Sequence, residues 1–195
     1  ATIARKKFTL KKWKGGIMRC LVSGSSGFLG QALCKELTKQ GHSVQALPRD
    51  WKKVADFDWL FHLGTVGNYD NNINPTEIVK VNLVRTFDLL NASLNIPYKK
   101  FVNFSTSSVR LKRQTIYSAT KAGAEKLCAG FSQEYNKPIV TLEPYSVTGQ
   151  GEQENHLIPT IIRSCLGGEE MLFVPYPVHD FIDVVDVVKA AILIA

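Results

Sequence analysis

The 195-residue sequence lacks several features that mark specialised classes of protein. No apolar stretch reaches the length of a membrane-spanning helix, and there are no internal repeats or low-complexity tracts. The four cysteines show no C-x-x-C spacing, which argues against a zinc site or a disulfide framework. We therefore expect no metal site, reduced cysteines and a cytoplasmic protein. The apolar content of 45% fits a single globular α/β domain.

Acidic residues are absent from residues 1–19, which hold seven of the 24 lysines and arginines. The remaining 17 basic residues match the 17 acidic residues, so the net charge of +7 belongs to this end. Such an arm could contact nucleic acid, an anionic membrane or an acidic partner, but a solvated extension is the more common case and the one we favour. We assign residues 1–16 to a basic arm, disordered or added by processing, and residues 17–195 to one domain.

A glycine-rich turn follows the first apolar segment. Residues 17–22 have the length and composition of a buried strand, and residues 31–40 form a helical pattern that ends at Gly41. Between them lie Gly24, Gly27 and Gly30, in the strand–turn–helix context that a dinucleotide fingerprint requires. In that context the glycines allow a tight turn, close approach of a pyrophosphate and close packing of the helix on the sheet. An ordinary connection with incidental glycines is the alternative.

Tyr117 and Lys121 lie four residues apart on a predicted helix that runs towards Glu134, so they share one helix face. A tyrosine is a poor acid or base at neutral pH, but a nearby ammonium group favours the phenolate and lowers the pKa. Taken alone, the pair could be an ordinary surface tyrosine and lysine. Residues 100–109 change this view, because they read as a strand that ends in four hydroxyl residues. In a parallel sheet such a strand end faces the ligand site, but a Ser/Thr cluster could instead be a capping turn.

These features together resemble the extended short-chain dehydrogenase/reductases, the NAD(P)-dependent epimerases and dehydratases of sugar nucleotides. The resemblance runs from about Met18 to the last residue and includes a series of ordered motifs. They are Gly24-x-x-Gly27-x-x-Gly30, Phe61-His-Leu-Gly64, Val81-Asn82-Leu-Val-Arg-Thr86, Ser105-Thr-Ser-Ser-Val109, Tyr117-x-x-x-Lys121 with Glu125, Pro144-Tyr-Ser-Val-Thr-Gly149, Leu157-Ile-Pro-Thr-Ile-Ile162 and His179-Asp-Phe-Ile-Asp-Val-Val-Asp186. This resemblance implies a Rossmann-like, doubly wound parallel sheet.

The resemblance also implies roles for individual residues. Tyr117 would be the catalytic acid/base, Lys121 would lower its pKa and hold the nicotinamide ribose, and Thr106 or Ser107 would be the hydroxyl partner. The residues expected to bind the cofactor are Gly24, Ser25, Ser26, Gly27, Phe28, Leu29, Gly30, Arg49, Leu63, Gly64, Thr65, Asn82, Tyr117 and Lys121. The implied chemistry is hydride transfer at a secondary alcohol or ketone.

The sequence departs from the family pattern at three places. After the second predicted strand the family often carries an acid, whereas here Pro48, Arg49 and Asp50 follow. Arg49 could hold a ribose 2′-phosphate, which favours NADP over NAD, while Asp50 keeps NAD open. A plain surface charge is the alternative for Arg49. Asp58 lies only ten positions after Pro48, which is too few for a helix and a strand, so the usual third strand is predicted to be missing. Ser146 and His179 stand where relatives carry asparagine and arginine for substrate phosphates, which weakens the nucleotide-sugar assignment.

The remaining segments predict alternating strands and helices. Asn74 and Pro75 form a good helix start, residues 138–142 are typical of a strand, residues 157–166 of a helix, and Asp183 of the cap of a last helix.

The resemblance implies a homodimer through the helix after Asn74 and the Tyr117 helix. We also expect that the C-terminal substrate lobe of relatives is missing. His42 and His62 have no metal-ligand companion and are interpreted as structural. The leading function is an NAD(P)-dependent oxidoreductase, epimerase or dehydratase of a sugar-nucleotide-like substrate; the alternative is a cofactor-binding module without turnover.

Overall fold

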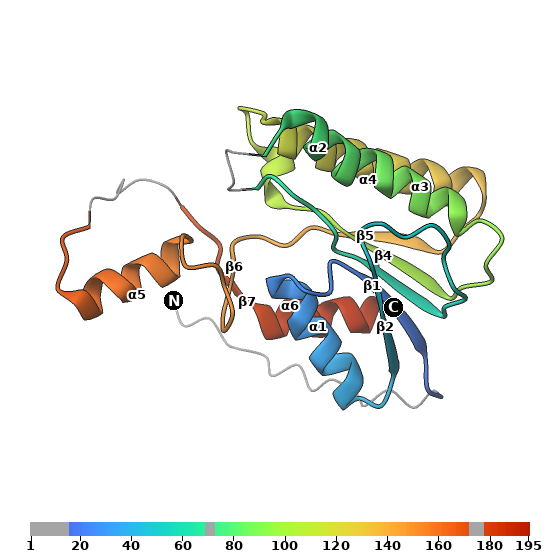
Figure 1. Cartoon of the computed structure of the whole chain (residues 1–195), viewed down its shortest axis with the longest axis horizontal. Coiled ribbons are helices and arrows are strands. Elements are labelled where there is room, and N and C mark those ends of the chain that lie inside the picture. The colour runs from blue at the N-terminus through green and yellow to red at the C-terminus, as the bar shows by residue number, and fades with distance from the viewer. Residues whose placement is uncertain (1–15, 69–72, 172–177) are drawn as a thin grey trace, which may run out of the picture.

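The computed structural model describes residues 16–68, 73–171 and 178–195. A parallel sheet of five strands forms its centre, in the order β2-β1-β3-β4-β5 (Figure 1). The strands are β1 (Arg19–Ser23), β2 (Ser43–Leu47), β3 (Trp59–His62), β4 (Lys100–Phe104) and β5 (Ile139–Leu142). This arrangement confirms the predicted doubly wound α/β fold.

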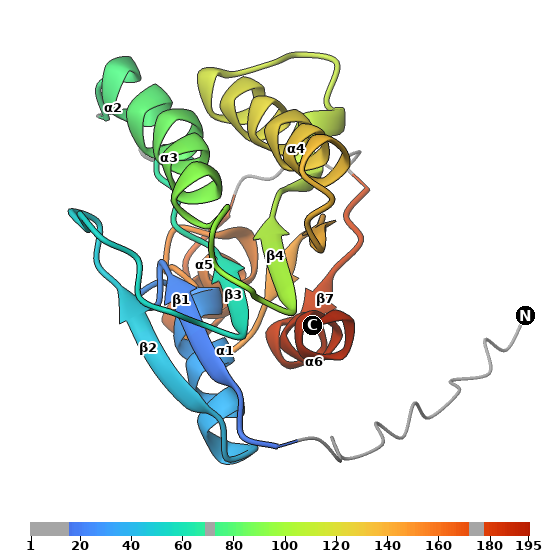
Figure 2. The same ribbon diagram turned by 90° about the vertical axis from the view of Figure 1, so that its right-hand side faces the viewer.

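Helices cover both faces of the sheet (Figures 1 and 2). One layer holds α1 (Phe28–Lys39) and α6 (Val184–Ile194). The other holds α4 (Ile116–Glu134) beside a continuous helical segment made of α2 (Pro75–Val79), the π-helical turn η1 (Lys80–Val84) and α3 (Arg85–Ala92). Beyond the sheet lie α5 (Leu157–Gly167) and a small parallel pair, β6 (Val147–Thr148) with β7 (Ile182–Asp183). A 3-10 turn, η2 (Ser107–Arg110), follows β4.

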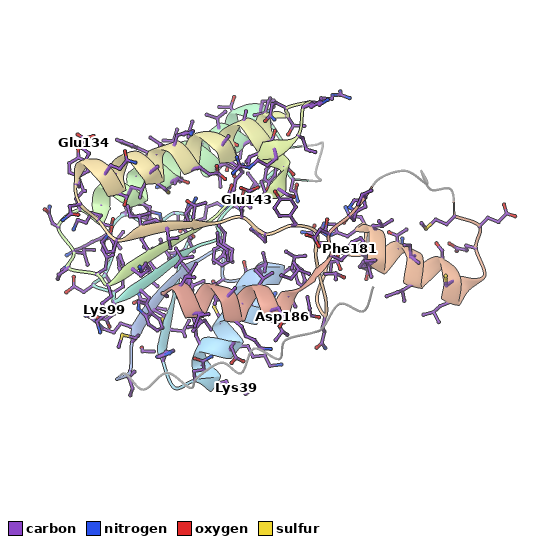
Figure 3. All side chains as sticks on the ribbon, turned by 180° about the vertical axis from the view of Figure 1, so that it is seen from behind. Lys39, Lys99, Glu134, Glu143, Phe181 and Asp186 are labelled. Carbon is purple, nitrogen blue, oxygen red and sulfur yellow. The ribbon has the colours of Figure 1, made fainter. Side chains whose placement is uncertain are left out.

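Apolar side chains of the strands alternate between the two helical layers, because successive side chains of a strand point to opposite faces. Trp59 and Phe61 of β3 pack in the cluster with α1 and α6, and Leu60 between them packs in the cluster with α3 and α4. All three are fully buried. Figure 3 shows the side chains filling both interlayer spaces. Burial on both sides explains why these strands read as continuous apolar runs in the sequence.

The predicted absence of the third strand is confirmed in the described part of the chain. β2 is an edge strand, and the chain passes from it directly to β3, which pairs with β1 on the other side. The connecting segment starts with a turn closed by a hydrogen bond from the Trp51 N–H to the Pro48 carbonyl, at 3.3 Å. It ends at Asp58, whose carboxylate accepts hydrogen bonds from the backbone and guanidinium of Arg19.

Most predicted elements are present, with shifted ends. Helix α1 begins at Phe28, three residues before the predicted start, because the glycine turn leads directly into its first turn. The strand predicted over residues 100–109 ends at Phe104. Asn74, Thr115 and Asp183 each cap a helix through a side-chain oxygen. The π-helical turn and the β6–β7 pair were not predicted. None of the helices in the described ranges combines the length and apolar character needed to cross a bilayer.

Candidate functional site

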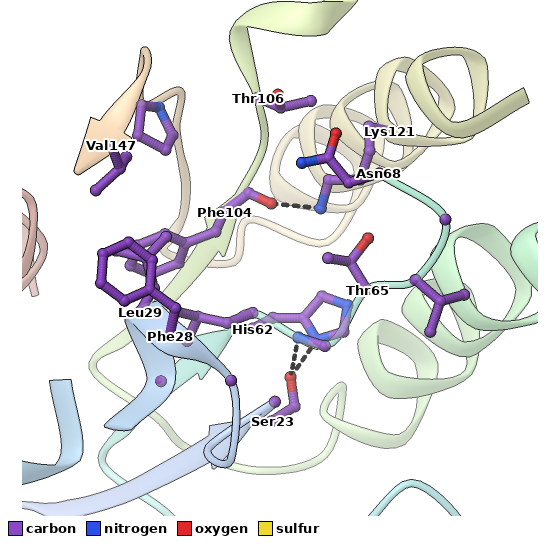
Figure 4. A pocket seen from close by; sticks show the side chains of 18 of the residues that line it. Ser23, Phe28, Leu29, His62, Thr65, Asn68, Phe104, Thr106, Lys121 and Val147 are labelled. Carbon is purple, nitrogen blue, oxygen red and sulfur yellow. Dashed lines mark hydrogen bonds between the residues drawn. The ribbon is translucent and has the colours of Figure 1, made fainter. Parts of the chain in front are cut away.

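A large cleft, with a volume of about 1230 Å³, lies at the carboxyl ends of the strands. The glycine turn after β1, the loop after β3 and the hydroxyl cluster after β4 meet there (Figure 4). Of the residues assigned to the site from the sequence, all but Asn82 line this cleft, and Ser146 and His179 do so at the end near β6. Segments more than 100 residues apart in the sequence therefore share one cavity.

At two of its three glycines, Gly24 and Gly30, the turn leaves no room for a side chain. Gly24 has φ +69, and a Cβ there would lie 2.7 Å from the Gly64 nitrogen. A Cβ on Gly30 would lie 2.1 Å from the Gly24 carbonyl oxygen. At Gly27, the N-cap of α1, the nearest atom to a Cβ would be 3.4 Å away, and no side chain caps this helix end. The first N–H groups of α1 are thus left for an anion, as in a pyrophosphate cradle.

Tyr117 and Lys121 lie on the first turns of α4, whose start is fixed by a capping box between Thr115 and Ser118. Both side chains line the cleft although both are largely buried. The Lys121 ammonium donates a hydrogen bond to the Phe104 carbonyl at the end of β4 (Figure 4). Burial lowers the pKa of Lys121 to about 8, and the nearby Cys128 and Glu125 act in the opposite direction. Tyr117 therefore lies one helical turn before a desolvated lysine that is anchored to the sheet.

Thr106 and Ser107 face the same cleft as Tyr117. The Thr106 hydroxyl accepts a hydrogen bond from the Ser108 N–H at 3.2 Å and contacts the Ser108 hydroxyl at 3.2 Å, so it caps the η2 turn. The two readings of the hydroxyl cluster, site residues and capping turn, are thus compatible. The cap hydrogen bond occupies the Thr106 oxygen. Ser107 provides a second hydroxyl on the same wall of the cleft.

His62 forms a buried polar link under the cleft that the sequence did not reveal. Its Nδ1 lies 2.6 Å from the Ser23 hydroxyl and its Nε2 lies 2.9 Å from the Thr86 hydroxyl (Figure 4 shows the Ser23 contact). Thr86 donates to the Asn82 carbonyl, so it must accept from His62 Nε2–H, which leaves Nδ1 to accept from Ser23. Burial, with a smaller contribution from Lys121, lowers the pKa of His62 to about 3. A neutral imidazole therefore joins β1, β3 and α3.

Asn82 occupies a different place from the one expected. It does not line the cleft but lies behind the loop after β3, almost fully buried in the π-helical turn. Its side-chain oxygen accepts hydrogen bonds from the Thr65 hydroxyl and the Val66 N–H, and its amide donates to the Val66 carbonyl and to Thr120. An amide has donors and an acceptor that can hold both sides of a loop. Asn82 thus shapes the cleft wall from behind.

One end of the cleft is lined by cationic side chains, and the other is lined by hydroxyl, imidazole and carboxylate groups. Beside the glycine turn, at the end of β2, it is lined by Arg49, Trp51 and Arg85. At the other end Ser146, which has φ +24, shares a 3.3 Å contact with His179 Nδ1. Glu152, the single acid among the described lining residues, accepts from the Thr148 hydroxyl and contacts His156 Nδ1 at 3.1 Å. The residues in this paragraph other than Arg49, Ser146 and His179 were not selected from the sequence, because only the fold brings them to the cleft.

A sequence model of a known protein family, described as "NAD dependent epimerase/dehydratase family", matches residues 20–195. The chain belongs to this family. Among curated epimerase/dehydratase relatives, a trifunctional UDP-glucose 4,6-dehydratase, epimerase and reductase of Arabidopsis thaliana is 28% identical over 65% of this chain and 21% of its own length. The UDP-N-acetyl-alpha-D-glucosaminuronate decarboxylase of Bacillus cytotoxicus is 24% identical over 79% of this chain and 63% of its own length. The chain thus spans less than two thirds of these two relatives.

Solved structures of family members share the fold. The UDP-N-acetylglucosamine 4-epimerase of Methanobrevibacter ruminantium superposes with a TM-score of 0.80 at 23% identity, over 92% of this chain and 73% of the epimerase. The UDP-glucuronic acid 4-epimerase of Bacillus cereus, solved with NAD, gives 0.78 at 21% identity, over 90% and 71%.

The residues around the glycine turn fit a nicotinamide dinucleotide. The glycine cradle and the uncapped start of α1 would hold the pyrophosphate, and the loop of Leu63, Gly64 and Thr65 would flank it. Lys121, which lines the same cleft, would donate to a ribose hydroxyl. No cluster of three or more potential metal ligands exists within the described ranges.

Proposed function

We propose that this epimerase/dehydratase family member is an NAD(P)-dependent oxidoreductase, epimerase or dehydratase of a nucleotide-sugar-like substrate. One observation carries the proposal: Tyr117, Lys121 and the hydroxyls of Thr106 and Ser107 line the same cleft as the glycine turn. The nucleotide cradle and the proposed acid/base pair thus share one cavity. The substrate class is supported by the nucleotide sugars named for the relatives.

In this mechanism Tyr117 exchanges a proton with the substrate oxygen. Lys121 stabilises the tyrosinate, because a positive charge in a buried site favours a nearby anion. Thr106 or Ser107 orients the substrate oxygen by a hydrogen bond. When bound, the nicotinamide supplies the hydride acceptor and donor that interconvert a secondary alcohol and a ketone.

The same proposal assigns the substrate end to Ser146 and His179 and the cofactor preference to Arg49. Ser146 and His179 contact each other at the end of the cleft opposite Arg49, where they can donate to polar groups of the substrate. Arg49 is exposed at the rim and has no acidic partner within ion-pair distance among the described residues. It is available for the 2′-phosphate of NADP, which we expect to bind more tightly than NAD.

Replacing Tyr117 with phenylalanine tests the chemistry, because it removes only the hydroxyl. Cofactor affinity should barely change, while turnover falls by roughly 10²- to 10⁴-fold, the usual contribution of positioned acid–base catalysis. The measurement is single-turnover hydride transfer, followed by nicotinamide absorbance, with each protein saturated with cofactor and offered UDP- and CDP-sugars.

Two further variants separate the roles. Lys121→Ala should weaken both cofactor binding and turnover, whereas Thr106→Val should cost less if Ser107 can replace it. Equal rates in wild type and Tyr117→Phe would remove Tyr117 from the mechanism. Cofactor binding without turnover in any protein would favour the binding-module alternative.

A further inference from the structure

The segment that replaces the missing third strand gives the cleft an unusual end. Pro48–Trp51 forms a turn with Arg49 and Asp50 at its central positions. Arg49 and Trp51 line the cleft, whereas Asp50 does not. This turn follows β2, whose last residue, Leu47, pairs with Ser23 immediately before the glycine turn. In this fold, the adenosine ribose of a dinucleotide lies at that strand end.

A second arginine lines the same end of the cleft, and it comes from helix α3. Arg85, in α3, lines the cleft, and its guanidinium carbon lies 5.6 Å from the centroid of the Trp51 ring. The ring itself packs against the core cluster that contains Leu47 and Phe57. A guanidinium over an indole face gains cation–π attraction and loses orientational freedom. Trp51 therefore fixes Arg85 at the wall of the cleft.

The charges at this end are uncompensated. No carboxylate of the described residues lies within ion-pair distance of Arg49 or Arg85. The single acid among the described lining residues, Glu152, belongs to the opposite end of the cleft. An NAD-type ribose site is expected to carry an acid that binds the free hydroxyls. Two unpaired guanidiniums suit a dianion instead, because each can donate paired hydrogen bonds to phosphate oxygens.

We propose that Arg85, oriented by Trp51, joins Arg49 to form a binding site for the 2′-phosphate of the adenosine ribose. This inference rests on the proposed function for the presence of a dinucleotide, and it adds the residues that select the phosphorylated form. Arg49 supplies a charge from the rim, Arg85 supplies one from the opposite wall, and Trp51 is a positioning residue.

Adenosine 2′,5′-bisphosphate and adenosine 5′-monophosphate test the site directly, because they differ only in the 2′-phosphate. We expect calorimetry to show tighter binding of the bisphosphate to the wild-type chain. Arg85→Gln should weaken the bisphosphate by roughly 10- to 100-fold, the usual worth of hydrogen bonds to a charged group, and leave the monophosphate almost unchanged. Trp51→Leu should lose part of the same preference, and Trp51→Phe, which keeps an aromatic face, should lose less.

Arg163→Gln is the matched control, since Arg163 is an exposed arginine on α5, outside the cleft lining. It should change neither affinity, and thermal unfolding should show all variants folded. Equal binding of the two fragments to the wild type, or equal weakening of both by Arg85→Gln, would overturn the phosphate site and leave the proposed function intact. Failure of the wild type to bind either fragment would count against both.

Discussion

At the scale of single residues, the structure around the cleft is held by hydrogen bonds between buried polar side chains. His62 is the clearest case, because hydrogen bonds to Ser23 and Thr86 occupy both ring nitrogens. The ring is fully buried against the uncharged side chains of Ser23, Thr86 and Phe101, and the nearby charge of Lys121 lowers its pKa further. This environment permits the neutral ring and opposes the protonated one.

The stability of the protein should therefore fall as the solution becomes acidic. In the unfolded chain His62 takes up a proton near pH 6.5, but its folded pKa is about 3. Between these values the unfolded state binds more protons, so the free energy of unfolding decreases with falling pH, with a slope of up to about 1.4 kcal/mol per unit from this group. Urea titrations at pH 7, 6, 5 and 4 would measure it.

His62→Asn is the comparison for that experiment. It should have a lower free energy of unfolding at pH 7 but a flatter acid limb, since the titrating group is gone. His42, whose pKa is also lowered by burial, remains in both proteins and contributes equally. If the two proteins lose stability with the same slope, His62 does not account for the acid limb.

At the scale of elements, the turn after β1 lies close against the start of α1. Gly30→Ala would place a methyl group against the Gly24 carbonyl, so either the turn or the helix must move. We expect a loss of about 1–3 kcal/mol in the free energy of unfolding, as for overpacked sites, together with weaker cofactor binding. Denaturant unfolding and a cofactor titration would measure the two effects.

Gly130 provides the matched glycine-to-alanine control within a helix. A Cβ there meets nothing within 4 Å, so Gly130→Ala should raise stability by up to about 1 kcal/mol through helix propensity alone. A neutral Gly30→Ala alongside a stabilised Gly130→Ala would show that the turn can relax without cost.

The sequence could predict those elements that are defined by the local spacing of residues. The strand, glycine turn and helix around Gly24, and the helix carrying Tyr117 and Lys121, rest on local spacing, so their positions follow from the sequence. The links of His62 to Ser23 and of Arg85 to Trp51 join residues 39 and 34 positions apart, so no local pattern reveals them. β6 and β7 have two residues each, too few for a periodicity. Asn82 matched a motif, but only its burial behind the loop shows which surface it serves.

At the scale of the whole molecule, one helical layer presents apolar side chains to solvent. Val84, Phe87 and Ile116 are each 44–46% exposed on the segment of α2 to α3 and on the start of α4. These helices lie side by side over the sheet (Figure 2). We propose that this layer packs against its copy in a second molecule as a four-helix bundle.

Charge at that layer should prevent assembly. The double variant Val84→Glu with Phe87→Glu should be monomeric by light scattering at high micromolar concentration, where the wild type is expected to be dimeric, because burying two carboxylates in an apolar interface is unfavourable. Leu166→Glu, at a highly exposed leucine on α5, should leave the mass unchanged. A wild-type mass equal to one chain would rule the bundle out.

The π-helical turn η1 affects which side chains of the helical segment from α2 to α3 face the protein. Ile78, Asn82, Thr86 and Leu90 are all buried, at a stride of four residues. On a regular α-helix such a stride overshoots by about 40° at each step, and the row would drift off the protein. The π-helical turn has more residues per turn, so it reduces this rotation and keeps the four side chains on the buried side of the segment. A chain one residue shorter between Lys80 and Val84 would wind regularly and rotate Thr86 by about 100°, away from His62.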